Sequence, residues 1–221
     1  MDYFISDPHL GHENIIKFGR KQFSSIEEHD KFFIDKIYEW ADKYKEGDTF
    51  WVLGDWGEPN FLYIMDVMNT KGIITKFVRG NHDKAEDMPR FKEYFQEVYE
   101  YPVYISNKLV VSHVPVATYE DTINIHGHTH RSYLKDLNHI PTCLDVINYE
   151  PVSMKHVQSN FGKIPKYTRR FLWEPFAKDY VFMDIERPDV VTNKRGEIDL
   201  SASRVLQKLA GNEKPSNYPQ N

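Results

Sequence analysis

The segment TFWVLGDWG, residues 49–57, joins an apolar run to a polar ending that contains two glycines. A short apolar run bounded by turn residues is typical of a buried β-strand. Asp55 would then lie where a strand ends and a loop begins, a position from which one carboxylate can reach two cations. Because a Gly-Asp pair after a strand is most often only a turn, its meaning depends on the other strand ends.

Four other polar segments repeat this arrangement after short strand-like runs: residues 7–9 (DPH), 80–83 (GNHD), 112–113 (SH) and 127–130 (GHTH). They supply carboxylate, amide and imidazole groups, a mixture that suits divalent transition metals better than calcium or magnesium. Alternate side chains of an extended stretch point the same way, so Asp7 and His9 can hold one ion.

Strand-like and helical segments alternate through the first half of the chain. Ser25 and Glu28 form a capping-box pattern that begins an amphipathic helix, which Gly47 closes. The alternation predicts parallel strands, one of them at residues 74–78, with the polar segments at one edge of the sheet. The second half predicts short, partly antiparallel strands at residues 103–105, 109–111, 123–125 and 143–146.

Taken in order, the five polar segments resemble the signature of the calcineurin-like metallophosphoesterase superfamily over roughly the first 150 residues. The run 7–16, together with Gly54-Asp55, is similar to a small bacterial and phage phosphoesterase branch. The resemblance implies an α/β fold in which two facing mixed β-sheets are flanked by helices. It also implies two divalent metal ions, manganese first, with iron, zinc, nickel and cobalt as alternatives.

The resemblance assigns a role to each polar residue of these segments. One ion takes Asp7, His9, Asp55 and His130, and the other takes Asp55, Asn81, His113 and His128. Asp55 bridges the ions, since its two oxygens can serve both. In the family pattern His82 is not a ligand but protonates the leaving alkoxide, and the adjacent Asp83 helps to orient it.

Three residues are candidate substrate contacts, namely His12, Arg20 and Asn81. His12 either contacts substrate phosphate in the pocket or hydrogen-bonds to a ligand carboxylate. Arg20 is interpreted first as a solvated surface charge and second as a phosphate contact. His29 is interpreted as a surface residue, and Asp145 as a turn residue, with a place at the pocket rim or behind a metal ligand as the alternative.

Residues 1–160 are predicted to form the catalytic domain, and residues 161–221 a C-terminal extension packed on it, with a loose tail. A basic cluster with interleaved aromatic residues lies at 163–173, and residues 199–210 predict a helix. A solvated loop is the commoner explanation of such a cluster. The alternative is a surface that binds a nucleotide or a single strand.

The composition limits the classes of partner. The 28 Lys and Arg against 33 Asp and Glu do not indicate a protein that binds nucleic acid by bulk charge. The single cysteine, Cys143, cannot form an internal disulfide, and the chain opens without a charged apolar leader, so we expect a cytoplasmic protein. The apolar stretches are too short to cross a bilayer, so we expect no membrane partner.

The sequence therefore predicts a metal-dependent phosphoric ester hydrolase. Its substrate would be a small phosphoester, a nucleotide-type phosphodiester or monoester, attacked by a metal-bridging hydroxide with His82 as general acid. The first alternative is a nuclease, with a polynucleotide as partner, or a protein phosphatase with the same dinuclear site. The second is a non-catalytic binding module, although such proteins typically lack ligands or the leaving-group histidine. The sequence does not indicate an oligomeric state.

Overall fold

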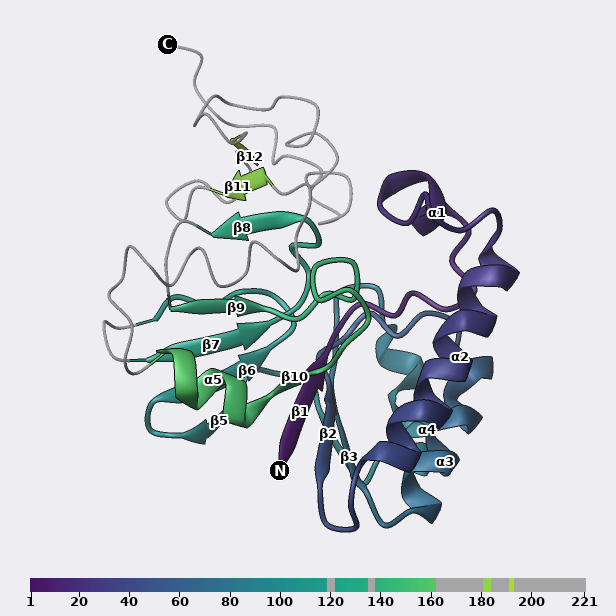
Figure 1. Ribbon diagram of the computed structural model, residues 1–221, viewed down its shortest axis with the longest axis horizontal. Helices are drawn as coiled ribbons and strands as arrows, with labels where there is room; N and C mark the ends of the chain where they lie inside the picture. The colour runs from purple at the N-terminus through teal and green to yellow at the C-terminus, as the bar shows by residue number, and fades with distance from the viewer. Residues whose placement is uncertain (119–121, 135–137, 162–180, 184–190, 193–221) are drawn as a thin grey trace. The chain divides into compact units, whose positions relative to one another are not determined.

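The computed structural model describes residues 1–118, 122–134, 138–161, 181–183 and 191–192 (Figure 1). The chain divides into two compact units, of which the larger comprises residues 1–131 and 137–178. The smaller unit comprises residues 132–136 and 179–221 and contains a three-stranded sheet. Its strands are β8 (Ser132–Leu134), β11 (Val181–Met183) and β12 (Val191–Thr192), with β11 parallel to β8 and antiparallel to β12.

Most of the predicted C-terminal extension lies outside the described residues. The basic cluster at 163–173 and the helix expected at 199–210 both lie outside them. The boundary at residue 160 and the packing of the extension therefore stay predictions.

The first sheet of the larger unit has the strand order β10-β1-β2-β3-β4. Its strands are β1 (Asp2–Ile5), β2 (Thr49–Val52), β3 (Ile74–Val78), β4 (Glu97–Tyr99) and β10 (Val152–Ser153). β1 to β4 are parallel to one another, and β10 runs antiparallel to β1. Parallel pairing places the carboxyl ends of β1, β2 and β3 at one edge, so the polar segments that follow them lie together.

The second sheet of the larger unit has the strand order β5-β6-β7-β9. Its strands are β5 (Val103–Ser106), β6 (Leu109–Ser112), β7 (Ile123–His126) and β9 (His139–Pro141). β6, β7 and β9 are parallel, and β5 is antiparallel to β6. A hydrogen bond from the N–H of Ser6 to the carbonyl of Thr142 (2.9 Å) and a bridge from Ser6 to Cys143 join the two sheets at the ends of β1 and β9.

Helices cover the first sheet on the side seen at the right of Figure 1, where α2, α3 and α4 lie together. The helices are α1 (Asn14–Phe18), α2 (Ile26–Lys43), α3 (Met65–Thr70), α4 (Met88–Tyr94) and α5 (Met154–Phe161), with 3₁₀ segments η1 (Pro59–Ile64) and η2 (Ala85–Asp87). α5 packs against β1 and β10. The predicted α/β fold with two mixed sheets flanked by helices is confirmed.

The longest helix, α2, begins as its capping pattern predicts. Oγ of Ser25 accepts a hydrogen bond from the N–H of Glu28 at 3.3 Å. The helix ends at Lys43, earlier than expected, because Tyr44 adopts an extended conformation with φ −85° and ψ 161°. Gly47 lies in the turn to β2 with a φ of 80°. Its buried face includes large side chains such as Trp40, while charged residues cover the other side. Among the described residues, no helix combines the length and apolar character needed to cross a membrane.

The prediction of a strand at residues 143–146 is wrong. This segment forms a turn in which the N–H of Val146 donates to the carbonyl of Cys143 at 2.8 Å. Only Cys143 pairs with a strand end, through its bridge to Ser6. The apolar residues that suggested a strand are buried because the turn is packed inside the molecule, since Leu144 and Val146 are both fully buried.

Candidate metal centre

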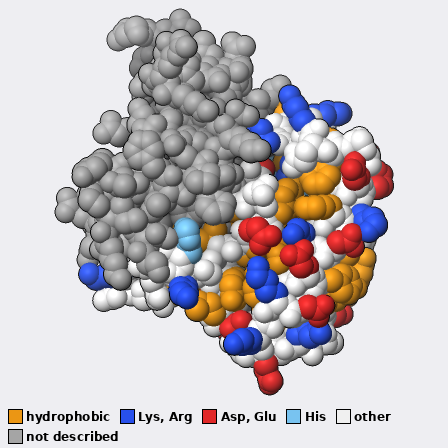
Figure 2. Space-filling view, in the orientation of Figure 1, with side chains coloured by type: hydrophobic (Ala, Val, Ile, Leu, Met, Phe, Trp, Pro, Cys, Tyr) orange, Lys and Arg blue, Asp and Glu red, His pale blue; other side chains and the backbone are white. Residues whose placement is uncertain are grey.

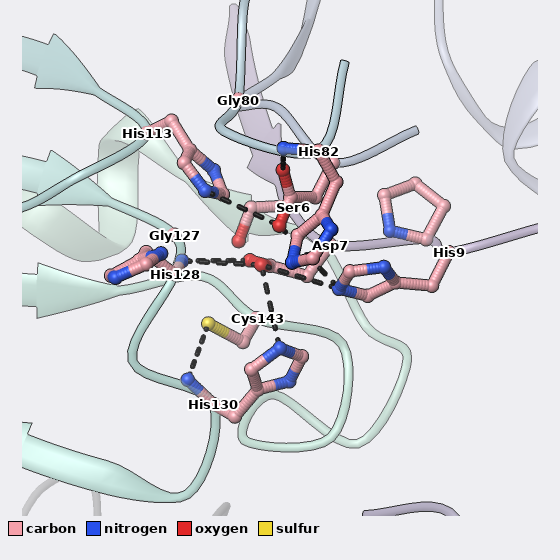
Figure 3. A network of polar contacts seen from close by, with 12 residues as sticks. Ser6, Asp7, His9, Gly80, His82, His113, Gly127, His128, His130 and Cys143 are labelled. Atoms are coloured by element: carbon pink, nitrogen blue, oxygen red, sulfur yellow. Dashed lines mark hydrogen bonds and ion pairs between the residues drawn. The ribbon is translucent and has the colours of Figure 1, made fainter. Parts of the chain in front are cut away.

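The backbone is strained where most of the predicted ligands lie. Five of them have a positive φ, namely Asp7 (57°), His9 (52°), Asp55 (53°), His128 (68°) and His130 (46°). Residues that carry a Cβ rarely enter this left-handed region, and those that do concentrate at functional sites. The sharp turns after β1 and β7 bring the side chains of these loops toward one centre (Figure 3).

Asp7, His9 and His130 form the first group of metal-ligand atoms, which lie within 4.8 Å of one another. Nε2 of His9 is 3.8 Å from Oδ1 of Asp7, and Nε2 of His130 is 3.7 Å from the same oxygen. The backbone N–H of His128 donates to the other oxygen, Oδ2, at 3.0 Å. A Cβ at Gly127 would lie 2.6 Å from Oδ2 of Asp7, so only glycine permits this close approach.

Asp55, His113 and His128 form the second group, with ligand atoms again within 4.8 Å of one another. Nε2 of His113 is 3.4 Å from Oδ2 of Asp55. Asn81 completes the group, because its Oδ1 is 2.8 Å from Nε2 of His113 and 2.9 Å from Nδ1 of His128. The residues predicted to hold the second ion therefore converge.

Asp55 joins the two groups through one oxygen. Its Oδ2 lies 3.6 Å from Nε2 of His9, in the first group, and 3.4 Å from Nε2 of His113, in the second. Its Oδ1 accepts a hydrogen bond from the backbone N–H of His82 at 2.9 Å. The expectation that Asp55 bridges the ions with its two oxygens stays a prediction. In the structure, Oδ1 is held by the loop and Oδ2 faces both groups.

Two imidazoles are oriented by hydrogen bonds on the side away from the ligand carboxylates. Nδ1 of His113 donates to the carbonyl of Leu53 at 2.9 Å, and Nδ1 of His130 donates to Oδ1 of Asp145 at 3.2 Å. A donating Nδ1 leaves the lone pair of a neutral ring on Nε2, the nitrogen that faces the carboxylates. Asp145 therefore lies behind a predicted ligand, which was the alternative to a simple turn residue.

The donor atoms fit divalent cations. Nε2 of His9 is buried and has no hydrogen-bond partner among the described residues. The oxygens of Asp7 and Asp55 that face it lie at 3.8 and 3.6 Å, beyond hydrogen-bond reach. A cation with nitrogen and oxygen ligands at about 2.0–2.2 Å bridges gaps of this size. Carboxylate, amide and imidazole donors together suit divalent transition metals.

Charge compensates for burial in the metal-free centre. Burial alone would lower the pKa of His113, but the charge of Asp55 raises it to about 10. Burial alone would raise the pKa of Asp55, but His113 and His9 hold it well below its usual range. The metal-free protein therefore keeps an ion pair between Asp55 and His113. A cation that takes the place of the His113 proton keeps this charge balance.

Asp83 holds the loop that carries Asp55. Its carboxylate accepts hydrogen bonds from the backbone N–H groups of Gly80 (2.7 Å), Asp55 (2.8 Å) and Trp56 (2.9 Å). Burial, and then the charge of Asp55, raise the pKa of Asp83 to about 6. Asp83 was predicted to orient the His82 ring. The contacts of its carboxylate are instead with the backbone around Asp55, the residue that joins the two groups.

Arg20 is fully buried, so its interpretation as a solvated charge is wrong, as is a direct contact with substrate phosphate. Its Nη1 donates to the carbonyl of Pro8 at 2.6 Å, and its Nη2 donates to the carbonyl of Asp7. Nη2 also lies 3.7 Å from Oδ1 of Asp145. Arg20 therefore braces the first ligand loop from behind, and its charge is balanced inside the protein.

His29 is also buried, which corrects its interpretation as a surface residue. Its Nε2 lies 2.7 Å from Nη1 of Arg20 and must accept, because a guanidinium has no acceptor. Nδ1 of His29 then donates to Oδ1 of Asp30 at 2.9 Å, and Oδ2 of Asp30 accepts from the N–H of Gly11 at 2.9 Å. The start of α2 is thus tied to both sides of the loop after β1.

His12 and His82 border a cavity of about 390 Å³ beside the first group. The centroid of the His82 ring is 5.5 Å from that of His9 and 5.9 Å from that of His12. His82 is exposed and His12 is half-buried, and burial lowers the pKa of His12. Of the two alternatives for His12, these positions favour the one in which it faces the pocket.

A family model for the calcineurin-like phosphoesterase superfamily domain matches residues 4–148. The chain belongs to this superfamily. The matched span contains all residues of both ligand groups. An uncharacterized protein of Methanocaldococcus jannaschii is 33% identical to the chain over 169 residues, which is 69% of this chain and 86% of that protein.

Two solved structures are similar to this superfamily member. A protein of unknown function from Aquifex aeolicus is 25% identical, with a TM-score of 0.55 over 72% of this chain and 98% of the other. The nuclease MPE of Pseudomonas putida is 17% identical, with a TM-score of 0.41 over 60% of this chain and 62% of the other. This second likeness does not indicate a substrate for the chain.

Proposed function

We propose that the chain is a dinuclear metal-dependent hydrolase of small phosphoesters. The observation that carries the proposal is the position of Oδ2 of Asp55, 3.6 Å from Nε2 of His9 and 3.4 Å from Nε2 of His113. One carboxylate oxygen that faces two ligand groups is an arrangement that can serve a pair of neighbouring cations. Such a pair, when bound, lowers the pKa of a water molecule and neutralises phosphoryl oxygens.

Manganese is the ion that we propose, with iron, zinc, nickel and cobalt as alternatives. The support is the donor set, which combines the carboxylates of Asp7 and Asp55 with imidazoles and the amide oxygen of Asn81. Hard oxygen donors alone would favour calcium or magnesium, whereas the four imidazoles of the two groups favour a transition metal.

His82 is proposed as the general acid that protonates the leaving oxygen. Its backbone is fixed by the hydrogen bond to Oδ1 of Asp55 at 2.9 Å, while its side chain is exposed above the first group. Figure 3 shows the His82 ring beside the His9 ring. An imidazole in this position can reach the oxygen that departs from a phosphoryl group bound at the ligands.

The proposed substrate is a nucleotide-type phosphomonoester or phosphodiester. The cavity of about 390 Å³ beside His82 is of the size of small-molecule sites. Acidic and basic side chains are interspersed among the described residues of the face seen in Figure 2, so these residues form no continuous basic surface for a polynucleotide there. The nuclease alternative rested on the cluster at 163–173, which lies outside the described residues.

The remaining alternatives receive less support. A non-catalytic binding module typically lacks ligands or the leaving-group histidine, whereas this chain has both ligand groups and His82 at their edge. A protein phosphatase needs the same ligands, and nothing in the described part of the chain favours it. A cytoplasmic setting stays a prediction.

The proposal is tested by a screen of the purified chain with added manganese. Phosphomonoesters, linear and cyclic phosphodiesters, and single- and double-stranded nucleic acids are compared, with Asp55→Asn as the blank. We expect manganese-dependent release from a small ester and a loss of at least about 100-fold in Asp55→Asn. Hydrolysis that survives in Asp55→Asn, or cleavage of polynucleotides alone, would contradict the proposal.

The general-acid role is tested by His82→Ala on esters with different leaving groups. An alkyl ester should lose about 10²–10⁴-fold in kcat, because its alkoxide needs a proton. An activated aryl phosphate should lose far less, since its leaving group departs as a stable anion. Equal losses on both esters would show that His82 acts in some other way.

A further inference from the structure

The cavity beside His82 extends away from the predicted metal ligands. His9, His12 and His82 line the end next to the first ligand group, and residues such as Asn60 and Arg90 line the remainder. A general acid must lie next to the oxygen that leaves. If a phosphoryl group is held by the ligands, the group that departs therefore occupies this cavity. This inference rests on the proposed function and identifies the group that leaves in the proposed hydrolysis.

The lining charges disfavour an anionic leaving group. Lys84 and Arg90 contribute two positive charges, and Glu58, Asp83 and Asp87 contribute three negative charges. Within this cavity, a leaving group that carries a further phosphate would meet more repulsion than attraction. Polynucleotide binding requires an excess of cations that neutralise several phosphates. The lining charges therefore favour an uncharged leaving group.

The lining groups also suit hydroxyl groups, which both donate and accept hydrogen bonds. Glu58 and Asp87 can accept from hydroxyls, and Lys84 can donate to them. Nη2 of Arg90 donates to Oδ1 of Asn60 at 3.2 Å, which leaves the amide nitrogen of Asn60 and the other Arg90 nitrogens as donors. Phe91 is only 1% exposed and offers no open face for stacking, so a nucleoside would be recognised through its sugar hydroxyls more than through its planar base.

The geometry points to an uncharged, hydroxyl-bearing leaving group such as a nucleoside, with its sugar hydroxyls bound between Glu58 and Arg90. A cavity of about 390 Å³ accommodates a group of this class, whereas a bare phosphate or a methyl ester would leave most of it empty. Glu58 and Arg90 are thus the residues that determine specificity, and neither is among the metal ligands.

The test compares four 5′-phosphates or simple phosphates with the manganese-loaded enzyme. They are adenosine 5′-monophosphate, its 2′,3′-dideoxy analogue, methyl phosphate and the dinucleotide pApA, whose loss of the terminal phosphate releases a charged group. Each is assayed as the monoester and as its methyl ester, so the result does not depend on the ester class. We expect kcat/KM for adenosine 5′-monophosphate to exceed that for each of the others by about tenfold.

The residues are tested with Glu58→Ala and Arg90→Ala, and with Lys92→Ala as the matched control, since Lys92 is exposed on α4 and does not line the cavity. We expect each cavity variant to lower the ratio of kcat/KM for adenosine 5′-monophosphate to that for the dideoxy analogue about tenfold. Lys92→Ala should leave the ratio unchanged. Glu58→Lys adds positive charge and should raise the relative use of pApA.

The outcomes separate the two proposals. The leaving-group assignment alone is overturned if methyl phosphate is hydrolysed as well as the nucleoside ester. It is also overturned if both cavity variants lose the same fraction of activity on every ester. A wild-type preference for pApA overturns it as well. If no ester is hydrolysed with any of the five metals, the proposed function is wrong and the assignment falls with it.

Discussion

The carboxylate of Asp83 accepts a hydrogen bond from the backbone N–H of Asp55 at 2.8 Å. A residue outside the predicted ligand set therefore fixes the residue that joins the two ligand groups. The same carboxylate also accepts from Gly80 and Trp56, so it ties the loop after β2 to the loop after β3. A Cβ at Gly80 would lie 2.2 Å from Oδ1 of Asp55, which shows how closely these loops approach.

Replacing Asp83 by alanine should destabilise the manganese-loaded protein and weaken metal binding. Three buried N–H groups would lose their acceptor, and each such loss costs about 1–3 kcal/mol, although the costs do not simply add. We expect the free energy of unfolding to fall by about 3 kcal/mol in denaturant titrations. Asp35→Ala is the control, because Asp35 is exposed and pairs only with Lys31 on α2. Equal stability of the two variants would contradict this role.

Replacing Arg20 by methionine should weaken one ion more than the other. Arg20 contacts the carbonyl of Asp7 and lies 3.7 Å from Asp145, which supports His130. Asp7 and His130 both belong to the first ligand group. Partners behind metal ligands typically contribute about 10–100-fold in metal affinity. We expect calorimetric titration with manganese to show one weakened site and one site close to that of the wild type.

A purely structural role of Arg20 would give a different result. A general loss of packing would lower the melting temperature and weaken both ions alike. Lys17→Met controls for the loss of a nearby charge, because Lys17 is exposed in α1. Uniform weakening of both sites in Arg20→Met would contradict the assignment to the first group.

The ligands were predictable because their positions follow from a simple rule of chain organisation. Each strand of the parallel sheet ends at the same edge, so Asp7, Asp55 and Asn81 had to lie close together. The resemblance supplied the division into two groups, and the distances agree with it. The position of Oδ2 of Asp55 between the two groups could not be foreseen, because it depends on the loop N–H of His82 that holds Oδ1.

The residues behind the ligands were not predictable from polarity. Arg20 and His29 are charged or polar, and such residues are usually exposed unless they are paired. A signal was nevertheless present in α2, where His29 and Asp30 lie three and four positions after Ile26 and so share its buried face. For Asp145, a place behind a metal ligand was only the alternative to a turn, and its segment was expected to be a strand because buried turns and short strands have similar apolar sequences.

Metal binding should stabilise the fold. The two ligand groups draw side chains from the ends of β1, β2, β6 and β7, and the bound ions would hold these ends together. Binding to the folded state alone contributes about 2.7 kcal/mol when the free metal is at 100 times its Kd. We expect manganese to raise the melting temperature of chelator-treated protein and calcium to raise it much less. An equal shift with both metals would contradict the transition-metal assignment.

The stability of the metal-free protein should depend on pH through His29. Burial lowers the pKa of His29, the charge of Arg20 lowers it further, and Asp30 and Asp145 oppose this only in part. Its folded pKa is therefore below the unfolded value of about 6.5. The contribution of His29 to stability is present above pH 6.5 and is lost as the pH falls, because the unfolded chain then binds the proton more readily.

His29→Gln removes this titration while keeping a side chain that can accept from Arg20. We expect the difference in the free energy of unfolding between wild type and His29→Gln to shift against the wild type as the pH falls from 7.5 to 5.5. One proton contributes at most about 1.4 kcal/mol per pH unit. Denaturant titrations of chelator-treated protein at three pH values measure the difference. Because both proteins share every other titrating group, a difference that stays constant with pH would show that His29 is not the neutral, buried partner of Arg20.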